Sequence, residues 1–262
     1  MFKRNLSWTL LLAAIAGGPL LAQPQISGTG SCSSSTLNTT YAVSIASRQV
    51  TNGTFSTVEH QLGTVVFDGN GNATFNTTVN SNSKSGQTNT STATYSLNAN
   101  CTGTLTNGSV TFSLVVYALG SSFNSFTLTG NNGGLVVTGN GTPITTSCMD
   151  GGAASFVINA NGFALNGTTV TGAAELTGLF QVDGMGNLTA TWSVANGTTT
   201  TTVNAKGQYS IGTNCQGGIT LVDNASMTTY VFSFAVVGNG NNFNFIGSSP
   251  SLIFAGAGHD IS

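Results

Sequence analysis

Apolar and polar residues alternate with a period of two along most of the chain beyond residue 40. The alternation is clearest over residues 73–79, 110–117, 188–194 and 230–236. Successive side chains of a β-strand point to opposite faces of a sheet, so this pattern predicts strands with one buried face. Threonine and aromatic residues, which are frequent in these runs, suit such a surface.

Turn signals separate the predicted strands. Asn-Gly pairs occur at residues 52–53, 107–108, 166–167 and 196–197. Both residues tolerate the positive φ angles of tight hairpin turns. No stretch beyond the N-terminal segment predicts an amphipathic helix. We therefore expect an all-β protein with roughly seven to nine short strands in each half of the chain.

The two halves of the chain repeat one another. The sequence Asp-Gly-x-Gly-Asn begins at Asp68 and again at Asp183, 115 residues later. Other matches at nearly the same offset are Cys32 with Cys148, Tyr41 with Phe156, Asn52 with Asn166, Gly63 with Gly178, residues 95–103 with 209–217, and Gly120 with Gly240. Matches in the same order indicate an internal duplication, with units at residues 32–143 and 148–260.

The strand pattern of each unit predicts one small antiparallel β-domain. A closed barrel leaves no exposed strand edges, and about eight strands enclose either a packed interior or room for one small ligand. We therefore expect two tandem antiparallel β-barrels. A pair of β-sandwiches, which also suits many short strands, is the alternative.

Charge is scarce in this chain. Charged residues make up 5% of the sequence and hydrophobic residues 39%, whereas about 25% charged residues is typical of a soluble domain. Because disorder accompanies low hydrophobicity and high charge, we expect the chain to fold. Thr, Ser, Asn and Gly must then provide its solubility.

The N-terminus predicts an export signal. Lys3 and Arg4 precede an apolar run that is too short to span a bilayer and ends near Ala22. We expect residues 1–22 to be a signal peptide and the protein to be secreted or to lie in the periplasm or cell envelope. A retained N-terminal anchor is the alternative, and no membrane span is expected after signal removal.

The mature chain would be slightly acidic. Two of the five basic residues lie in the signal, which leaves three against seven acidic residues, a net charge of −4. There is no basic patch, which argues against nucleic acid and anionic lipid surfaces as partners.

The four cysteines predict two disulfides. Cys32, Cys101, Cys148 and Cys215 form an even set in an exported chain, and none has the spacing of a zinc or thioredoxin-type site. The repeat favours Cys32–Cys101 and Cys148–Cys215, which close each unit on itself. A pairing between the units remains the alternative.

The order of motifs resembles a group of small exported proteins of soil bacteria. Cys32 precedes a strand containing Tyr41, a Phe-Asp-Gly-x-Gly-Asn turn follows at residues 67–72, and a Thr-Tyr-Ser segment leads to Cys-Thr-Gly at 94–103. The second unit departs from this pattern at Gln208 and Gln216. The resemblance implies lipocalin-like or allene-oxide-cyclase-like barrels and export. The group has no assigned activity, and no motif matches the catalytic residues of the cyclases.

Residues for catalysis are few. His60 and His259 are the only histidines, neither recurs in the other unit, and no nucleophile elbow or phosphate-binding loop is present. Paired carboxylates hydrolyse sugars when they lie about 5–9 Å apart. Glu59 with Asp68, and Glu175 with Asp183, are the only pairs that roughly repeat. We expect neither catalytic residues nor a cofactor, and therefore no enzyme.

The Asp-Gly-x-Gly-Asn segments admit two interpretations. Asp68, Asn70 and Asn72 could supply oxygen ligands to calcium. The second copy has Met185 in the middle position, however, and no acidic residue follows at the distance needed to complete either site. A hairpin turn is the better interpretation, so no metal site is expected.

These observations favour a non-catalytic binding module for a small apolar ligand or a glycan. A structural or surface-interaction protein of the cell envelope without a ligand pocket is the main alternative, and an outer-membrane barrel is a third. Trp192 shares a strand face with apolar residues, so we expect it in the core and not on a sugar-binding surface.

Overall fold

A computed structural model of the chain describes residues 31–262, except residues 53, 120–122, 145–147, 149–151 and 239. The predicted signal peptide 1–22, Gly53 of one predicted turn and Gly120 of one repeat match lie outside the described residues. Within the described part, one short 3-10 helix, η1 (Ser34–Thr36), precedes sixteen β-strands. The all-β prediction is confirmed. No helix there is long and apolar enough to cross a bilayer.

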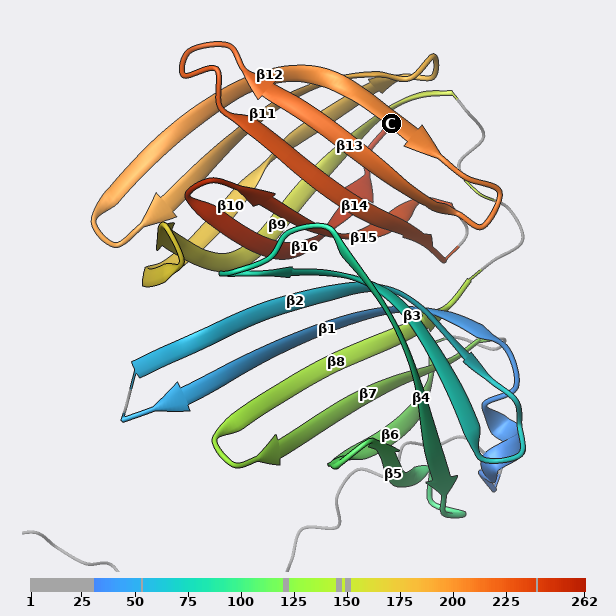
Figure 1. Cartoon of the computed structure of the whole chain (residues 1–262). Helices are drawn as coiled ribbons and strands as arrows, with labels where there is room; N and C mark the ends of the chain where they lie inside the picture. Colours follow the sequence, from blue (N-terminus) through green and yellow to red (C-terminus); the bar gives the residue numbers. More distant parts are fainter. Residues whose placement is uncertain (1–30, 53, 120–122, 145–147, 149–151, 239) are drawn as a thin grey trace, which may run out of the picture.

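The strands form two closed eight-stranded antiparallel barrels (Figure 1). The first contains β1 (Thr40–Thr51), β2 (Thr54–Phe67), β3 (Asn72–Ser81), β4 (Gln87–Leu97), β5 (Thr102–Asn107), β6 (Val110–Leu119), β7 (Phe123–Asn132) and β8 (Leu135–Pro143). The second contains β9 (Ala153–Asn166), β10 (Thr169–Asp183), β11 (Asn187–Asn196), β12 (Thr199–Ile211), β13 (Gln216–Asp223), β14 (Thr229–Val237), β15 (Asn242–Ser249) and β16 (Leu252–Asp260). Tandem barrels are therefore confirmed, and the sandwich alternative is excluded.

Each barrel closes between its first and last strands. β1 pairs with both β2 and β8, and β9 pairs with both β10 and β16. Consecutive strands are neighbours throughout, so no strand edge remains unpaired in either barrel.

The two barrels share one register, so their positions can be compared one by one. Tyr41 lies opposite Val65 in the first barrel, and Phe156 lies opposite Phe180 in the second. The offset of 115 residues therefore holds on both strands. Antiparallel partners share a face, so each pair also identifies which side chains point into the barrel.

Both barrel interiors contain interlocking aromatic rings. In the first barrel, Phe67 makes edge-to-face contacts with Tyr41, Tyr95 and Phe126, with ring centroids 4.9–5.5 Å apart. In the second, the buried rings are Phe156, Phe180, Trp192, Tyr230, Phe232, Phe234, Phe243, Phe245 and Phe254. Edge-to-face pairs add about 0.5–1.5 kcal/mol each beyond the burial of their area.

One outer wall of the first barrel packs against the second barrel. Strands β1, β2 and β3 contact β14, β15 and β16, and β2 also contacts β10. Figure 1 shows the two barrels stacked on one another. Ala42 and Leu62 pack with Ala235, Val237 and Ile246 in one buried cluster. The junction is therefore formed by outward-facing side chains and is separate from both barrel interiors.

Candidate binding site

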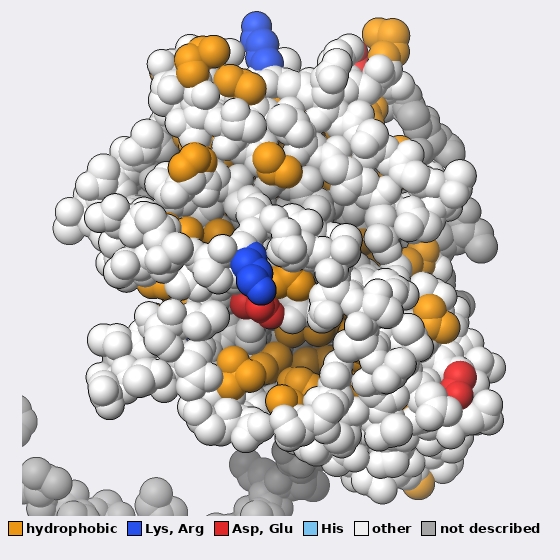
Figure 2. Space-filling model, viewed as in Figure 1, with side chains coloured by type: hydrophobic (Ala, Val, Ile, Leu, Met, Phe, Trp, Pro, Cys, Tyr) orange, Lys and Arg blue, Asp and Glu red, His pale blue; other side chains and the backbone are white. Residues whose placement is uncertain are grey.

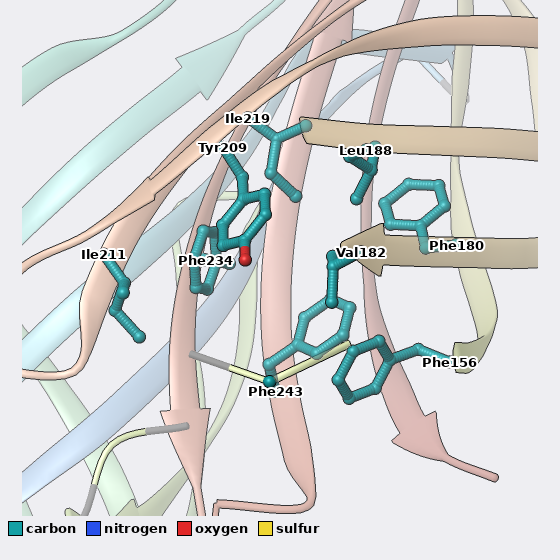
Figure 3. A pocket seen from close by; sticks show the side chains of 10 residues that line it. Phe156, Phe180, Val182, Leu188, Tyr209, Ile211, Ile219, Phe234 and Phe243 are labelled. Atoms are coloured by element: carbon teal, nitrogen blue, oxygen red, sulfur yellow. The ribbon is translucent and has the colours of Figure 1, made fainter. Parts of the chain in front are cut away.

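The interior of the second barrel is nearly filled. A cavity of about 40 Å³ remains between Phe156, Phe180, Phe234 and Phe243 at one end. Figure 3 shows these rings, with Tyr209, converging on it. The volume holds a few water molecules at most and is far below the roughly 300 Å³ at which ligand pockets begin. This cavity is therefore too small for a ligand of ordinary size.

The first barrel is closed at one end by its own N-terminal segment. Leu37 is fully buried there, and the hydroxyl of Tyr95 lies 2.8 Å from the carbonyl oxygen of Ser34 and 2.9 Å from that of Leu37. The Cys32–Cys101 disulfide attaches this segment to the loop between β4 and β5. Cys148–Cys215 is the corresponding bridge of the second barrel, so the pairing is the symmetric one.

The end of the first barrel away from its N-terminal segment has different side chains from the corresponding end of the second barrel. At matching inward positions the first barrel has Thr77 for Trp192, Gln61 for Leu176, Glu59 for Ala174, Asn107 for Leu221, Val110 for Tyr230 and Val137 for Phe254. Large apolar side chains are thus replaced by smaller or polar ones. We call this end of the first barrel the cup.

Hydrogen bonds between side chains order the polar wall of the cup. Thr77 Oγ1 donates to Gln61 Oε1 at 3.1 Å, and Gln61 Nε2 donates to Glu59 Oε1 at 2.6 Å. On the other side, Asn107 Nδ2 donates to Ser91 Oγ at 2.9 Å. These bonds use one carboxylate oxygen of Glu59 and one amide hydrogen of Asn107, so both side chains keep further hydrogen-bonding capacity.

The floor of the cup is apolar and partly exposed. Ile45, Phe112 and Leu135 point inward from β1, β6 and β8 and pack only partly buried against the barrel core. Figure 2 shows the lower barrel hollowed on this side, with hydrophobic side chains inside the hollow. A half-exposed apolar floor beneath amide and hydroxyl groups is typical of small-molecule sites.

A glycine lies opposite Thr77 on the neighbouring strand, as it does opposite Trp192. In the second barrel a Cβ on Gly178 would collide with Trp192, and in the first a Cβ on the matching Gly63 would collide with Thr77 and Asn76. The two strands therefore approach each other equally closely at both positions, although only the second barrel has a tryptophan there.

The structure separates the carboxylates that the sequence suggested as catalytic pairs. Glu59 and Asp68 lie nine residues apart along β2 and its following turn, which is about 30 Å in an extended strand. Glu175 and Asp183 lie eight residues apart on β10, about 26 Å. Moreover, Glu59 points into its barrel, whereas Glu175 points outward, since its neighbours Ala174 and Leu176 are buried inside. Neither pair has the spacing of a glycosidase.

The aspartates of the repeated turns bind their own backbone. Asp68 Oδ1 accepts from the N–H groups of Asn70 (2.7 Å) and Asn72 (2.9 Å), and Asp68 Oδ2 accepts from Asn72 Nδ2 (2.7 Å). Asp183 repeats this with Met185 and Asn187. The side-chain amides of Asn72 and Asn187, followed by these N–H groups, lower the pKa of both aspartates. The turn interpretation fits this geometry.

No metal-binding cluster is present in the described part of the chain: nowhere in it do three His, Cys, Asp or Glu side chains come together. Residues 85–149, which include all of β4 to β8, contain no charged side chain. The outer wall formed by β4 to β8 therefore carries no charge.

His60 lies in the junction between the barrels and outside the cup. It is 2% exposed, its ring stacks on Phe163 of β9 with centroids 6.3 Å apart, and neither ring nitrogen has a hydrogen-bond partner. Burial and, to a lesser extent, the nearby Arg48 lower the pKa of His60 to about 4. His259 is exposed on β16, where Nδ1 lies 2.8 Å from Asn242 Oδ1. The two histidines therefore belong to different environments.

Trp192 is 1% exposed, as expected for a core residue. The cup itself was not predicted from sequence. Its signal was nevertheless present in the aligned repeats, where Thr77 and Gln61 of the first unit match Trp192 and Leu176 of the second.

The fold and the cup define a duplicated antiparallel β-barrel protein. No family model matches the chain, and no curated protein sequence matches it. The predicted membership in the exported barrel group is thus supported only as far as the two barrels.

Among solved structures, the chain is similar to the isotype 1 transferrin binding protein B from serogroup B Neisseria meningitidis, with a TM-score of 0.34 and 10% identity over 81% of this chain and 54% of that one. This chain spans about half the length of that protein. It is also similar to a protein of unknown function from the DUF3598 family of Nostoc punctiforme PCC 73102, with a TM-score of 0.24 and 8% identity over 86% of this chain and 96% of that one.

Proposed function

We propose that the protein is a non-catalytic binding module whose cup holds a small, neutral, hydroxylated molecule of the monosaccharide or disaccharide class. The observation that carries this proposal is the replacement of Trp192, Leu176 and Leu221 by Thr77, Gln61 and Asn107 at matching positions of one duplicated scaffold. The second barrel uses these positions to fill itself, and the first leaves them small and polar.

The chemistry of the cup supports this ligand class. A sugar ring has a hydroxyl rim and an apolar C–H face. The carboxylate of Glu59 and the amide of Asn107 offer acceptors and a donor to hydroxyl groups, and the ring of Phe112 offers an apolar surface to the C–H face. A cup of this polarity disfavours a purely apolar ligand, because such a ligand would leave these polar groups without partners.

Export supports the same proposal. Two disulfides close the two units, and disulfides persist mainly in oxidising compartments outside the cytoplasm. The basic and apolar N-terminal segment also favours export. We therefore place the binding module outside the cell or in its envelope. The second barrel is filled, which favours a structural role for that half. The alternative of a structural protein is therefore retained for the second barrel alone.

The experiment is native mass spectrometry and calorimetry of the purified chain with a panel of neutral monosaccharides and disaccharides. Thr77→Trp introduces the ring that the second barrel has at this position and is expected to weaken binding at least about 10-fold, or about 1.4 kcal/mol. Thr92→Trp, the same change on the exposed outer face of β4, is the matched control and should bind as the parent does.

A second variant covers the case in which Thr77→Trp fails to fold. Gln61→Leu with Asn107→Leu restores the residues of the second barrel and should also abolish binding. The proposal fails if no sugar of the panel binds, or if both cup variants fold and bind like the parent.

A further inference from the structure

The outer wall of the first barrel that packs against the second barrel has a matching wall on the second barrel, with the same strands in the same register. Strands β1 to β3 match β9 to β11 at the offset of 115 residues. In the first barrel this wall is covered: His60 is 2% exposed and Leu62 is 3% exposed. In the second barrel the matching residues, Glu175 and Thr177, are exposed.

The residues on the uncovered wall have changed in chemistry. Ser44, Ala46, His60 and Leu62 of the first barrel are matched by Asn159, Asn161, Glu175 and Thr177 of the second. A wall that packs against protein in one unit thus carries amide, hydroxyl and carboxylate groups in the other. Such a wall no longer suits another protein surface of the kind that covers the first.

The uncovered wall is hollowed. A trough of about 420 Å³ lies along it, lined on its polar side by Asn159, Asn161, Glu175, Thr177, Ser193 and Thr200. Small residues, among them Ala195, Ala255 and Gly256, lie between them. This volume is within the range of roughly 300–1,000 Å³ for ligand sites, and none of the lining residues comes from the first barrel.

The trough is elongated across the strands. Ala255, Asn161, Glu175, Ala195 and Thr200 follow one another in a single row of strand partners over β16, β9, β10, β11 and β12. Four steps of about 4.8 Å give a length of about 19 Å. A row of this length fits an extended chain better than a single compact molecule.

The lining offers both donors and acceptors and holds one charge. Thr177 Oγ1 donates to Asn159 Oδ1 at 3.0 Å, which leaves the Asn159 amide hydrogens directed to other acceptors. Asn161 adds a second amide, and Glu175 is the only charged residue of the lining. The absence of a cation from this lining disfavours acidic polymers, whereas hydroxyl groups suit every polar group present.

We infer that the trough on β9 to β12 and β16 binds an extended strand of a neutral polysaccharide. This site lies on the outer wall of the second barrel and does not depend on the cup. The protein would then hold a polysaccharide at one barrel and a small hydroxylated molecule at the other.

A second copy of the chain is the competing occupant. The junction presents Ile246 and Phe163 to the covered wall, and the matching positions of the first barrel are Thr129 and Arg48. The first barrel therefore lacks the apolar surface that would continue the stacking onto another copy, and the trough stays available.

The test uses the full exported chain carrying Thr77→Trp, so that the cup is blocked. Cellohexaose, laminarihexaose and maltohexaose are titrated by calorimetry, and the matching disaccharides are titrated in parallel. We expect at least one hexasaccharide to bind at least 10-fold more tightly than its disaccharide, since only the longer chain spans the trough.

Glu175→His with Thr177→Leu places the residues of the first barrel in the trough and should remove this binding. Thr189→Leu, on the same outer wall of β11 but away from the trough, is the matched control and should leave it unchanged. The inference is overturned if no hexasaccharide binds at millimolar concentration, or if the double substitution leaves the affinity unaltered. Sedimentation that shows a dimer of the parent, lost in the double variant, would overturn it in favour of self-association.

Discussion

At the scale of single residues, His60 is the most unusual side chain of the junction. Its imidazole is enclosed by protein without any hydrogen bond, and Arg48 is the charged group that acts on it among the described residues. Protonation inside the junction would place a second positive charge beside Arg48 in an apolar environment. The pKa of about 4 in the folded state lies below the ordinary value of 6.5, so the unfolded chain takes up this proton first.

Folding stability should therefore fall as the pH drops from about 6.5 to about 4. A difference of about 2.5 pKa units corresponds to about 3 kcal/mol in the free energy of unfolding. Urea unfolding measured at pH 7 and at pH 4.5 should show most of this loss. In His60→Leu, which removes the titrating group and no hydrogen bond, the two values should agree much more closely.

His259→Gln serves as the control because it removes the other histidine from an exposed strand. This variant should lose stability with pH as the parent does. If His60→Leu retains the full loss between pH 7 and pH 4.5, another group is responsible. The four aspartates with lowered pKa values, Asp68, Asp183, Asp223 and Asp260, lose their contribution only below their ordinary pKa and thus at lower pH.

At the scale of elements, the repeated Asp-Gly-x-Gly-Asn turns set the register of the hairpins β2–β3 and β10–β11. Backbone N–H groups in each turn have no partner on a neighbouring strand. They donate hydrogen bonds to the aspartate of the turn instead. Gly69 and Gly71 have φ angles of 74° and 101°, which side-chain-bearing residues rarely adopt. The turn is therefore complete without a cation.

Asp68→Ala and Asp183→Ala should each lower the melting temperature, because they leave turn N–H groups without an acceptor. Adding calcium to the parent should leave the melting temperature unchanged, since both carboxylate oxygens already accept hydrogen bonds from the turn. Differential scanning calorimetry with calcium and with a chelator checks both statements. A rise in melting temperature with calcium that disappears in Asp68→Ala would restore the metal interpretation.

The β-strands and hairpin turns of this protein could be predicted from the sequence, because period-two alternation and a duplicated turn are local signals. The side on which a residue lies was harder to predict. Glu59 and Glu175 look equivalent as acidic residues shortly before the repeated turn, but they are offset by 116 residues and not 115. A shift of one residue moves a side chain to the other face of a strand, so one points into the cup and the other into the trough.

The junction was beyond sequence reasoning for a different reason. Outward-facing Leu62 and His60 interrupt the polar pattern of β2, but only the packing of the second barrel shows why they are apolar or unpartnered. Similarly, the cup depends on which inward positions are small in one barrel and large in the other. Both features arise from comparing the two units in three dimensions.

At the scale of the whole molecule, the junction should couple the folding of the two barrels. Two hydrogen bonds flank its apolar clusters: Asn82 Nδ2 donates to the carbonyl oxygen of Thr168 at 2.7 Å, and the hydroxyl groups of Ser85 and Ser248 lie 2.7 Å apart. Because each barrel also has its own closed sheet and core, a weakened junction should leave both folded.

Leu62→Asp should uncouple the barrels by placing a carboxylate in the apolar part of the junction. Within residues 23–262 Trp192 is the only tryptophan. In a chain of these residues its fluorescence therefore reports the second barrel, whereas far-ultraviolet circular dichroism reports both. The two probes should give one unfolding midpoint in the parent and separate midpoints in Leu62→Asp. Val66→Asp, on the same outer face of β2 at a position that is 43% exposed, is the control. Coincident midpoints in Leu62→Asp would show that the junction does not couple the barrels.

The run of 65 residues without a charge, 85–149, also bears on how the protein would meet the ligand that we propose. Long-range attraction between charges can raise association rates by orders of magnitude, and added salt removes this gain. The wall of β4 to β8 beside the cup has no charge to provide such steering, so encounters with a neutral ligand should proceed without electrostatic assistance. The rate of capture should consequently be the same in dilute and in salt-rich surroundings.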